Sequence, residues 1–208
     1  MFKIKEMNLY KTTDRFLNNY NYLKKTLKRE PTIEELSHID QLHYNGIEAV
    51  DEAIIKTKVK NNSLVLDIGS GIGGPARYIA SKTNSIIYAI EIQKELNDIA
   101  KKLTSNYKLN KLIHHIAADI LTFNFKKLKF DTIVSWLALY HIPNRTKLLK
   151  NLHDLLHVDG YIYVEDFYLK KKLTGDEKIN LSKQFHANHL INFKSCLLYT
   201  SDAADDVR

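Results

Sequence analysis

The chain has 208 residues, of which 44% are hydrophobic, a size and composition that suit one domain with a single buried core. Its net charge of +7 comes from lysines spread along the whole sequence, which favours a generally lysine-rich composition over a dedicated surface for nucleic acid or anionic membrane. The chain has one cysteine, Cys196, which excludes an internal disulfide and a multi-cysteine zinc site. The sequence has no apolar run long enough to cross a membrane and no secretion signal. We therefore expect a cytoplasmic protein without a membrane span.

Residues 1–45 are predicted to form a helical extension that acts as a lid. Apolar side chains between residues 2 and 27 recur at spacings near three and four, the pattern of an amphipathic helix. Thr32 and Glu35 have the spacing of a capping box, which predicts that a short helix starts just after Pro31. A further helix is expected over residues 46–58, ahead of the first strand.

Residues 64–74 (LVLDIGSGIGG) carry the strongest signal in the sequence. A short apolar run that contains Asp67 and leads into a glycine loop is typical of a buried strand that delivers a nucleotide-shaped cofactor to a helix N-terminus. Gly69 and Gly71 allow a tight turn close to the ligand, and the next two glycines allow the following helix to pack against the sheet. By itself the loop fits a dinucleotide site as well as any other adenosine site.

Four further strands are predicted after this loop, with a helix over residues 77–82 before the first of them. They are expected over residues 85–92, 114–118, 130–135 and 161–166, the last one after a turn at 155–160. Glu91 closes the earliest of these strands, where an acid can accept both ribose hydroxyls of a nucleotide. Asp119 follows the next strand, where an acid can meet the adenine edge.

The order of these elements resembles that of the class I S-adenosylmethionine-dependent methyltransferases. The similarity spans about residues 40–170, with Asp67 two residues before Gly69 and no second half for a nicotinamide cofactor. It implies an α/β fold, a Rossmann-like open and mainly parallel sheet with helices on both faces, preceded by the helical lid. It also implies S-adenosyl-L-methionine as the cofactor.

The C-terminal part is expected to be incomplete. A class I methyltransferase normally adds a sixth and a seventh strand, for which the sequence leaves little room. The composition changes abruptly at residues 195–208, which are not rich in lysine and asparagine like the rest of the sequence. This change predicts a non-native read-through tail. We therefore expect a methyltransferase domain over residues 46–194 of a truncated fragment.

Two stretches sharpen the resemblance. Residues 40–49 (DQLHYNGIEA) and 66–78 (LDIGSGIGGPARY) look like the small-molecule branch that includes sarcosine/dimethylglycine and phosphoethanolamine N-methyltransferases. A small-molecule amine is therefore the expected methyl acceptor. The run GGPAR at 73–77 also occurs in sterol C-methyltransferases, so a sterol-type or tocopherol-type C-methyltransferase stays an alternative. A cofactor-binding remnant without turnover is a second alternative.

The resemblance assigns the cofactor contacts to the glycine loop and the strand ends. It places Asp67 at the methionyl amino group, Glu91 at the ribose hydroxyls, and Asp119 with Ile120 at the adenine. Three acids at consecutive strand ends favour this role over that of ordinary turn or cap residues. The full set of expected cofactor-binding residues is Asp67, Gly69, Ser70, Gly71, Gly73, Glu91, Ile92, Asp119, Ile120 and Ser135.

His141 is the first candidate for a catalytic residue. It lies just beyond the predicted strand at 130–135, at the edge where open α/β sheets bind ligands, and a histidine is catalytic at the matching place in the phosphoethanolamine enzymes that this segment resembles. An imidazole there can remove a proton from an amine, and the alternative is a histidine that caps or packs the next helix. The same resemblance implies that a tyrosine from the N-terminal part works with His141 in catalysis. Tyr20, Tyr22 and Tyr44 are the candidates, and we prefer Tyr44.

The remaining candidates carry less weight, and no metal is expected. His153 and His157 have the spacing of a helical metal pair, but no third ligand accompanies them. Asp166, Phe167 and Tyr168 follow the last predicted strand, where they either line the acceptor pocket or serve as ordinary core residues.

Overall fold

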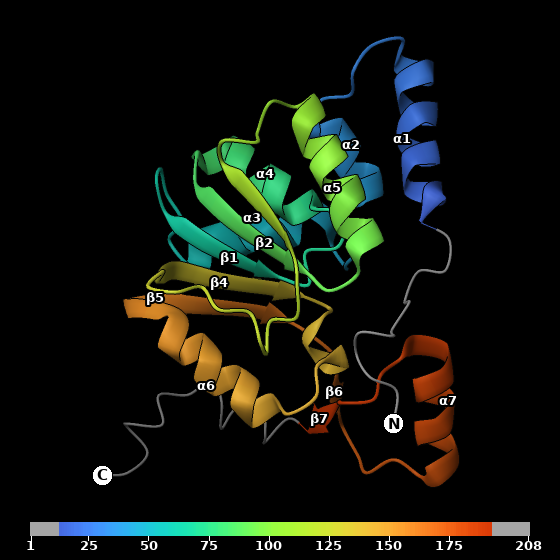
Figure 1. Cartoon of the computed structure of the whole chain (residues 1–208). Coiled ribbons are helices and arrows are strands. Elements are labelled where there is room, and N and C mark those ends of the chain that lie inside the picture. The colour runs from blue at the N-terminus through green and yellow to red at the C-terminus, as the bar shows by residue number, and fades with distance from the viewer. Residues whose placement is uncertain (1–12, 193–208) are drawn as a thin grey trace.

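The computed structural model describes residues 13–192, so the predicted read-through tail at 195–208 and the start of the N-terminal extension lie outside the described residues. Five parallel strands form one open sheet (Figure 1): β1 (Leu64–Ile68), β2 (Ile86–Glu91), β3 (Ile113–Ala117), β4 (Phe130–Trp136) and β5 (Leu156–Glu165). Their order in space is β3-β2-β1-β4-β5. This order confirms the predicted Rossmann-like fold, and it puts the carboxyl ends of β1 and β4 side by side where the strand order reverses.

The residues of β1 explain why this strand lies at the centre. Val65, Leu66 and Ile68 are at most 1% exposed, because both faces of a parallel sheet are covered and its strands are apolar throughout. Asp67 is also only 1% exposed. The strand therefore carries one acid into the interior, directly before the glycine loop.

Helices cover both faces of the sheet (Figure 1). On one face α3 (Gly46–Lys56) and α4 (Gly74–Thr83) share an apolar core with β1, β2 and β4. On the other face α6 (Arg145–Leu155) shares a second core with the same three strands. The carboxyl edge of the sheet is left open for a ligand.

The N-terminal extension consists of α1 (Asp14–Leu27) and α2 (Ile33–Asp40). The predicted capping box is confirmed: Thr32 Oγ1 accepts from the Glu35 N–H at 3.1 Å, and the Glu35 carboxylate accepts from the Thr32 N–H at 2.8 Å. Tyr20 of α1 is buried in a cluster that includes Ile72 of the glycine loop and three side chains of α5 (Lys94–Asn106). The extension is thus packed against the loop that follows β1.

One predicted boundary was wrong. The sequence predicts a turn over residues 155–160, whereas β5 already begins at Leu156. Leu156 pairs with Phe130, but the next paired residue is Tyr161, so the residues between them bulge out of the sheet. Asp159 in this bulge has φ of 64°, and the strand continues beyond the bulge.

After β5 the chain forms a small separate unit. It consists of β6 (Tyr168–Leu169), α7 (Gly175–Phe185) and β7 (Ile191–Asn192), in which β6 and β7 pair in parallel. The unit contacts the short 3-10 helix η2 (Leu139–His141) after β4, because the His189 N–H donates to the Tyr140 carbonyl at 3.1 Å. Within residues 13–192, no helix combines the length and the apolar character that crossing a membrane requires.

Candidate functional site

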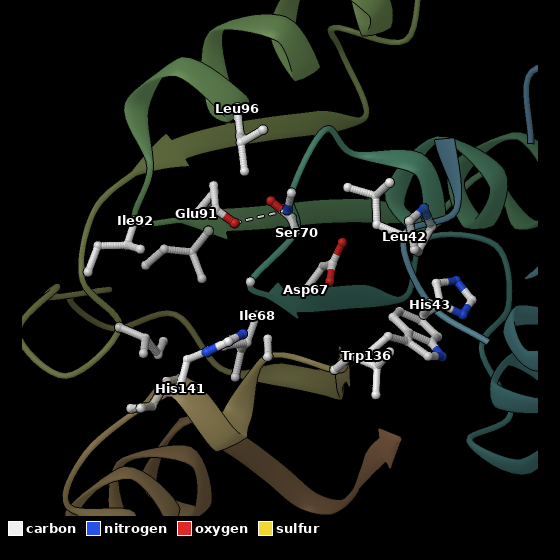
Figure 2. A pocket seen from close by; sticks show the side chains of 18 of the residues that line it. Leu42, His43, Asp67, Ile68, Ser70, Glu91, Ile92, Leu96, Trp136 and His141 are labelled. Carbon is white, nitrogen blue, oxygen red and sulfur yellow. Dashed lines mark hydrogen bonds between the residues drawn. The ribbon is translucent and has the colours of Figure 1, made fainter. Parts of the chain in front are cut away.

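A cavity opens at the carboxyl ends of β1, β2 and β4, next to the segment that follows α2 (Figure 2). Most of the predicted cofactor residues line it, namely Asp67, Gly69, Ser70, Gly71, Glu91, Ile92, Asp119 and Ile120. Leu42, His43, Trp136 and His141 contribute to the remaining wall. The fold thus brings together side chains from distant parts of the sequence.

The glycine loop between β1 and α4 is fixed by backbone contacts. The N–H groups of Gly69 and Ser70 both donate to the Ile90 carbonyl, at 2.9 and 3.1 Å. Gly69 has φ of 68°, and a Cβ at this position would lie 2.3 Å from the Ala138 Cβ. Both the backbone conformation and the lack of space therefore require glycine, and the loop backbone itself forms part of the cavity wall.

Two predicted cofactor residues support the site from behind and do not line the cavity. Gly73 has φ of 77°, and a Cβ there would lie 2.8 Å from the His115 ring and 3.0 Å from the Arg77 guanidinium. Ser135 is buried and its hydroxyl donates to the Ile68 carbonyl at 3.0 Å, which ties β4 to β1. In this structure Gly73 makes room for packing and Ser135 joins two strands.

Two buried carboxyl groups, Asp67 and Glu91, face the cavity (Figure 2). Burial and the neighbouring Glu91 raise the pKa of Asp67 to about 7, and the Asp67 Oδ2 atom has no hydrogen-bond partner among the described residues. Burial also raises the pKa of Glu91, although the N–H groups of Gly71 and Gln93 donate to its carboxylate at 3.0 and 2.8 Å and oppose that rise. This arrangement favours a ligand that brings positive charge to Asp67 and hydroxyl donors to Glu91.

Asp119 and Ile120, which follow β3, both line the cavity, and Asp119 also stabilises a turn. One carboxylate oxygen of Asp119 accepts from the Leu121 N–H at 2.9 Å, so the residue caps a turn as well as lining the cavity. Ile120 is 7% exposed, and with Ile92 it adds apolar surface to the cavity. Apolar surface with a few polar groups at its edge suits a flat aromatic ring.

His141 lies at the end of η2 and lines the cavity, as predicted from its place after β4. Its Nδ1 lies 3.1 Å from the His186 carbonyl, which can only accept, so Nδ1 carries the proton. Burial lowers the pKa of His141 to about 4. The imidazole is therefore neutral near pH 7, and its Nε2 lone pair can accept a proton.

The candidate partner tyrosines do not line this cavity. Tyr44 is 60% exposed, and its ring meets Phe167 edge-on at a centroid distance of 6.0 Å. Tyr20 is buried between α1 and α5, where its hydroxyl accepts from Asn106 Nδ2 at 2.9 Å, and Tyr22 is 74% exposed. Through Phe167 and Tyr140, whose ring centroid lies 3.9 Å from that of His141, the Tyr44 ring belongs to the same aromatic cluster as His141.

The residue next to Tyr44 reaches the cavity instead. His43 lines it, with its ring stacked on Trp136 at a centroid distance of 5.4 Å and an interplanar angle of 26°. Sequence reasoning missed both residues as site residues. The signal that points to them is their position, since His43 belongs to the stretch 40–49 and Trp136 ends β4 at the ligand edge.

The residues after β5 lie next to the cavity without lining it. Burial raises the pKa of Asp166 to about 6, and Arg145, 3.5 Å away, opposes this rise. Phe167 is 41% exposed and meets Tyr140 edge-on at a centroid distance of 5.4 Å. Both residues are thus close to η2, on the side where His141 lies.

The structure also bears on the histidine pair at 153 and 157. His153 is on α6, but His157 belongs to β5, so the two residues do not share a helix and the helical spacing does not apply. Across residues 13–192, no three or more His, Cys, Asp or Glu side chains gather in a way that could hold a metal ion.

Comparison with protein families gives one match at this site. A family model described as a methyltransferase domain matches residues 66–164. The matched stretch runs from β1 into β5, so it includes the glycine loop, Asp67, Glu91 and His141.

Two relatives from this comparison differ in the reactions that their names describe. The phosphoethanolamine N-methyltransferase of Plasmodium falciparum (isolate 3D7) is 31% identical over 180 residues, which cover 86% of this chain and 64% of that protein. The sterol 24-C-methyltransferase of Debaryomyces hansenii is 26% identical over 123 residues, which cover 59% of this chain and 33% of that protein. This chain therefore spans less than two thirds of the length of either relative.

A solved structure shares the fold. The phosphoethanolamine N-methyltransferase 2 of Haemonchus contortus in complex with S-adenosyl-L-methionine matches with a TM-score of 0.76 at 17% identity, over 96% of this chain and 43% of that chain. At this identity the likeness establishes the architecture, including the open parallel sheet and its ligand edge.

Proposed function

We propose, from the premise that this chain belongs to the class I S-adenosylmethionine-dependent methyltransferases, that it transfers a methyl group to the nitrogen of a small amine. The observation that carries the proposal is the pair of buried carboxyl groups beside the glycine loop, in which Asp67 Oδ2 lacks a hydrogen-bond partner within residues 13–192. A buried polar atom of this kind is costly unless a ligand satisfies it.

The residues present fit S-adenosyl-L-methionine, the cofactor of this family. Asp67 would accept from the methionyl amino group, and Glu91 from the ribose hydroxyls. Ile92 and Ile120 would contact the adenine, with Asp119 at its edge. When bound, S-adenosyl-L-methionine supplies an electrophilic methyl group on its sulfonium.

The acceptor side supports an amine. An amine attacks only through its lone pair, so the protein must hold the acceptor nitrogen unprotonated and close to the methyl group. His141 offers a bare Nε2 for the proton that such an amine loses, while its Nδ1 proton is held by the His186 carbonyl. The surrounding Trp136, Leu137 and Ile142 keep this part of the cavity apolar and limit access of water.

A sarcosine/dimethylglycine or phosphoethanolamine type of acceptor is the first choice, and the name of the Plasmodium falciparum relative supports the second of these types. Sterol-type C-methyl transfer is the second candidate, because the sterol 24-C-methyltransferase of Debaryomyces hansenii is also a relative. The two candidates use the same cofactor site and differ only in the acceptor.

Titration calorimetry tests the cofactor site. We expect S-adenosyl-L-methionine and S-adenosylhomocysteine to bind and NAD not to bind, because the acids and glycines fit one adenosine and one amino-acid tail. Glu91→Ala should weaken binding by about 1.5–3 kcal/mol, the range for a hydrogen bond to a charged group, and Glu91→Asp should lose less. Equal or tighter binding of NAD would refute the assignment.

Transfer of a labelled methyl group tests the acceptor. Two sets of acceptors are compared. The amine arm contains phosphoethanolamine, sarcosine and dimethylglycine, and the sterol arm contains a membrane sterol. Labelled product in the amine arm supports the proposal. Product in the sterol arm alone would replace it with the second candidate.

A further inference from the structure

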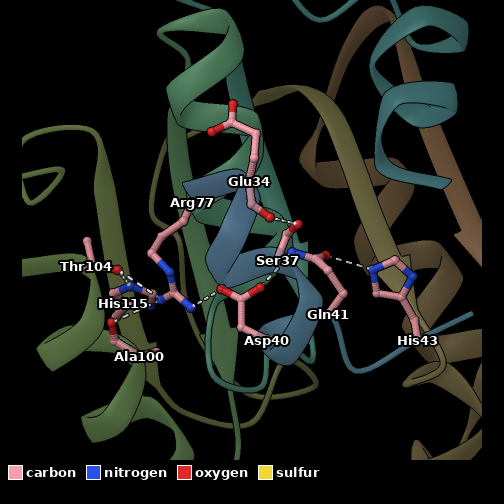
Figure 3. A network of polar contacts seen from close by, with 9 residues as sticks. All are labelled: Glu34, Ser37, Asp40, Gln41, His43, Arg77, Ala100, Thr104 and His115. Carbon is pink, nitrogen blue, oxygen red and sulfur yellow. Dashed lines mark hydrogen bonds and ion pairs between the residues drawn. The ribbon is translucent and has the colours of Figure 1, made fainter. Parts of the chain in front are cut away.

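A chain of polar contacts runs from the interior of the fold to the cavity wall (Figure 3). Arg77 of α4 is fully buried, and its Nη2 donates to Asp40 Oδ2 at 2.8 Å. The other oxygen of Asp40 accepts from Gln41 Nε2 at 2.9 Å. Because a carboxylate paired with arginine only accepts, this contact fixes which way the Gln41 amide points.

The orientation of the Gln41 amide determines which hydrogen bonds His43 can make. Gln41 presents Oε1 to His43, 3.0 Å from the His43 Nε2. The other ring nitrogen, Nδ1, lies 2.8 Å from the Tyr44 carbonyl. Both neighbours are acceptors, so the contacts are satisfied only when each nitrogen of His43 carries a proton.

His141 differs from His43 in this respect. Its Nδ1 has an acceptor, the His186 carbonyl, whereas its Nε2 has no hydrogen-bond partner within the part of the chain that the structure describes. The two histidines therefore line one cavity with opposite hydrogen-bonding requirements.

The charged groups around the two rings also differ. Near His43 are the carboxylates of Asp40, reached through Gln41, and of Glu165, which accepts from the Tyr44 N–H. Near His141 are His186 and His189, and Arg145 in turn acts on His189. Burial lowers the pKa of both cavity histidines; the hydrogen bond to the Tyr44 carbonyl opposes this for His43, whereas for His141 the neighbouring His186 and His189 lower the pKa further and only the His186 carbonyl opposes it.

We propose that His141 and His43 divide the work of the site, with His141 as the proton acceptor and His43 as a positioning residue that holds its two ring protons to a higher pH than His141 does and packs against Trp136. The Trp136 indole is 6% exposed, ends β4 and forms cavity wall, so its orientation sets the shape of the acceptor side. The role of His141 rests on the proposed function, whereas the protonation of His43 does not. Gln41 and Arg77 do not line the cavity, whereas Asp40 lines it as well as belonging to this network.

Nitrogen NMR of the imidazole rings tests this division directly, with signals assigned from His43→Gln and His141→Gln. The full chain is titrated without cofactor, so the readout is independent of methyl transfer. We expect His43 to hold protons on both nitrogens to a higher pH than His141, and His141 to show a proton on Nδ1 only. A bare nitrogen on His43 at a pH where His141 is doubly protonated would overturn the proposal.

Substitution of Gln41 tests the network. Gln41→Glu places a carboxylate opposite Nε2 and should raise the pKa of His43 by about one unit, while Gln41→Met removes the acceptor and should lower it. Asn61→Asp adds the same charge at the amino-end edge of the sheet and should leave both histidines unchanged. If Gln41→Glu and Gln41→Met give the same His43 titration as the wild type, the network does not act on His43.

A kinetic split separates positioning from proton transfer. His43→Gln should raise the KM for the acceptor at least about threefold and leave the pH dependence of kcat unchanged, because no proton passes through it. A change in the pH dependence of kcat would make His43 a proton-transfer residue and refute its positioning role. If no acceptor is methylated at all, the proposed function is refuted. The NMR titration then still tests the protonation of His43, because it does not depend on methyl transfer.

Discussion

Asp67 is the residue at which the requirements of folding and of ligand binding conflict. It is 1% exposed, and its Oδ2 has no partner among the described residues, so its charge is costly until a cation approaches. The pKa of Asp67 is raised from 3.8 to about 7, which means that the folded state prefers the protonated form. The stability that this preference contributes is fully present below pH 3.8 and is lost as the pH rises through about 7.

We therefore expect Asp67→Asn to stabilise the ligand-free protein at pH 8 and to have little effect at pH 4. The gain at pH 8 should be on the order of 2–4 kcal/mol, since each pKa unit corresponds to about 1.4 kcal/mol. Urea unfolding at both pH values measures it, with the exposed Asp159→Asn as the control. An advantage that does not grow between pH 4 and pH 8 would contradict this account.

The same substitution should weaken the binding of S-adenosyl-L-methionine by about 1.5–3 kcal/mol, because a neutral amide replaces the carboxylate facing the amino group. Stability and affinity thus change in opposite directions. Calorimetry at pH 8 measures the affinity, and unchanged binding would show that the methionyl amino group lies elsewhere.

His141 should matter for turnover and not for cofactor binding. We expect His141→Ala to lower kcat by about 10²–10⁴ with amines that lose a proton, the usual contribution of a general base. Because the pKa of His141 is lowered to about 4, its active neutral form is present above that pH, and the contribution of His141 to turnover should be lost as the pH drops through about 4.

The control for this variant is the methyl acceptor itself. Dimethylglycine, once deprotonated, has no further proton to lose after methylation, so its dependence on His141 should be confined to preparing the free base. Wild-type turnover of the variant with every amine and phosphoamine would leave His141 with a structural role only.

At the scale of elements, the local signals predicted the sheet well. The strands at β1 to β4 lie within a few residues of their predicted bounds, because buried parallel strands are continuous apolar runs between turn residues. The helix after Thr32 was equally predictable, since its capping box is a contact between near neighbours. What failed was the turn at 155–160, because a bulge in β5 has the same composition as a turn.

The candidate site was predictable where it follows from strand ends and not where it depends on packing. Asp67 and Glu91 end up in the cavity because the carboxyl ends of parallel strands share one edge. Whether the side chain of Tyr44 or that of the adjacent His43 lines the cavity depends instead on how the chain turns after α2, which no local pattern reveals. The supporting positions of Gly73 and Ser135 likewise follow from contacts with residues distant in the sequence.

The glycine loop allows a prediction at this scale. Gly69→Ala should destabilise the protein and abolish cofactor binding, because the new Cβ would meet Ala138 Cβ at 2.3 Å and φ is 68°. Gly175→Ala is the matched control, since a Cβ there meets nothing within 4 Å. Thermal unfolding and calorimetry measure both effects, and equal behaviour of the two variants would contradict the structure of the loop.

At the scale of the whole molecule, the Arg77–Asp40 ion pair joins the N-terminal extension to the sheet domain. Both side chains are at most 3% exposed, and the Asp40 carbonyl would lie 2.2 Å from a Cβ at Gly74, so α2 ends directly against the start of α4. Burial raises the pKa of Asp40, and Arg77 opposes this rise.

Removing one partner should therefore cost more than removing both. Arg77→Met leaves a buried carboxyl group without its cation and should destabilise the protein by about 3–5 kcal/mol, whereas Arg77→Met with Asp40→Leu should recover part of that loss. Urea unfolding of the two variants measures the difference. Equal losses would mean that the two groups are not energetically coupled.

The strand order has a consequence for how the protein forms during synthesis. β1 pairs with β2 on one side, but its partner on the other side is β4, which leaves the ribosome only after β2, β3 and the helix between them. Until then one edge of this buried strand has no neighbour, and nascent chains in this state are exposed to chaperones and to aggregation. The ligand edge is thus completed only when β4 pairs with β1.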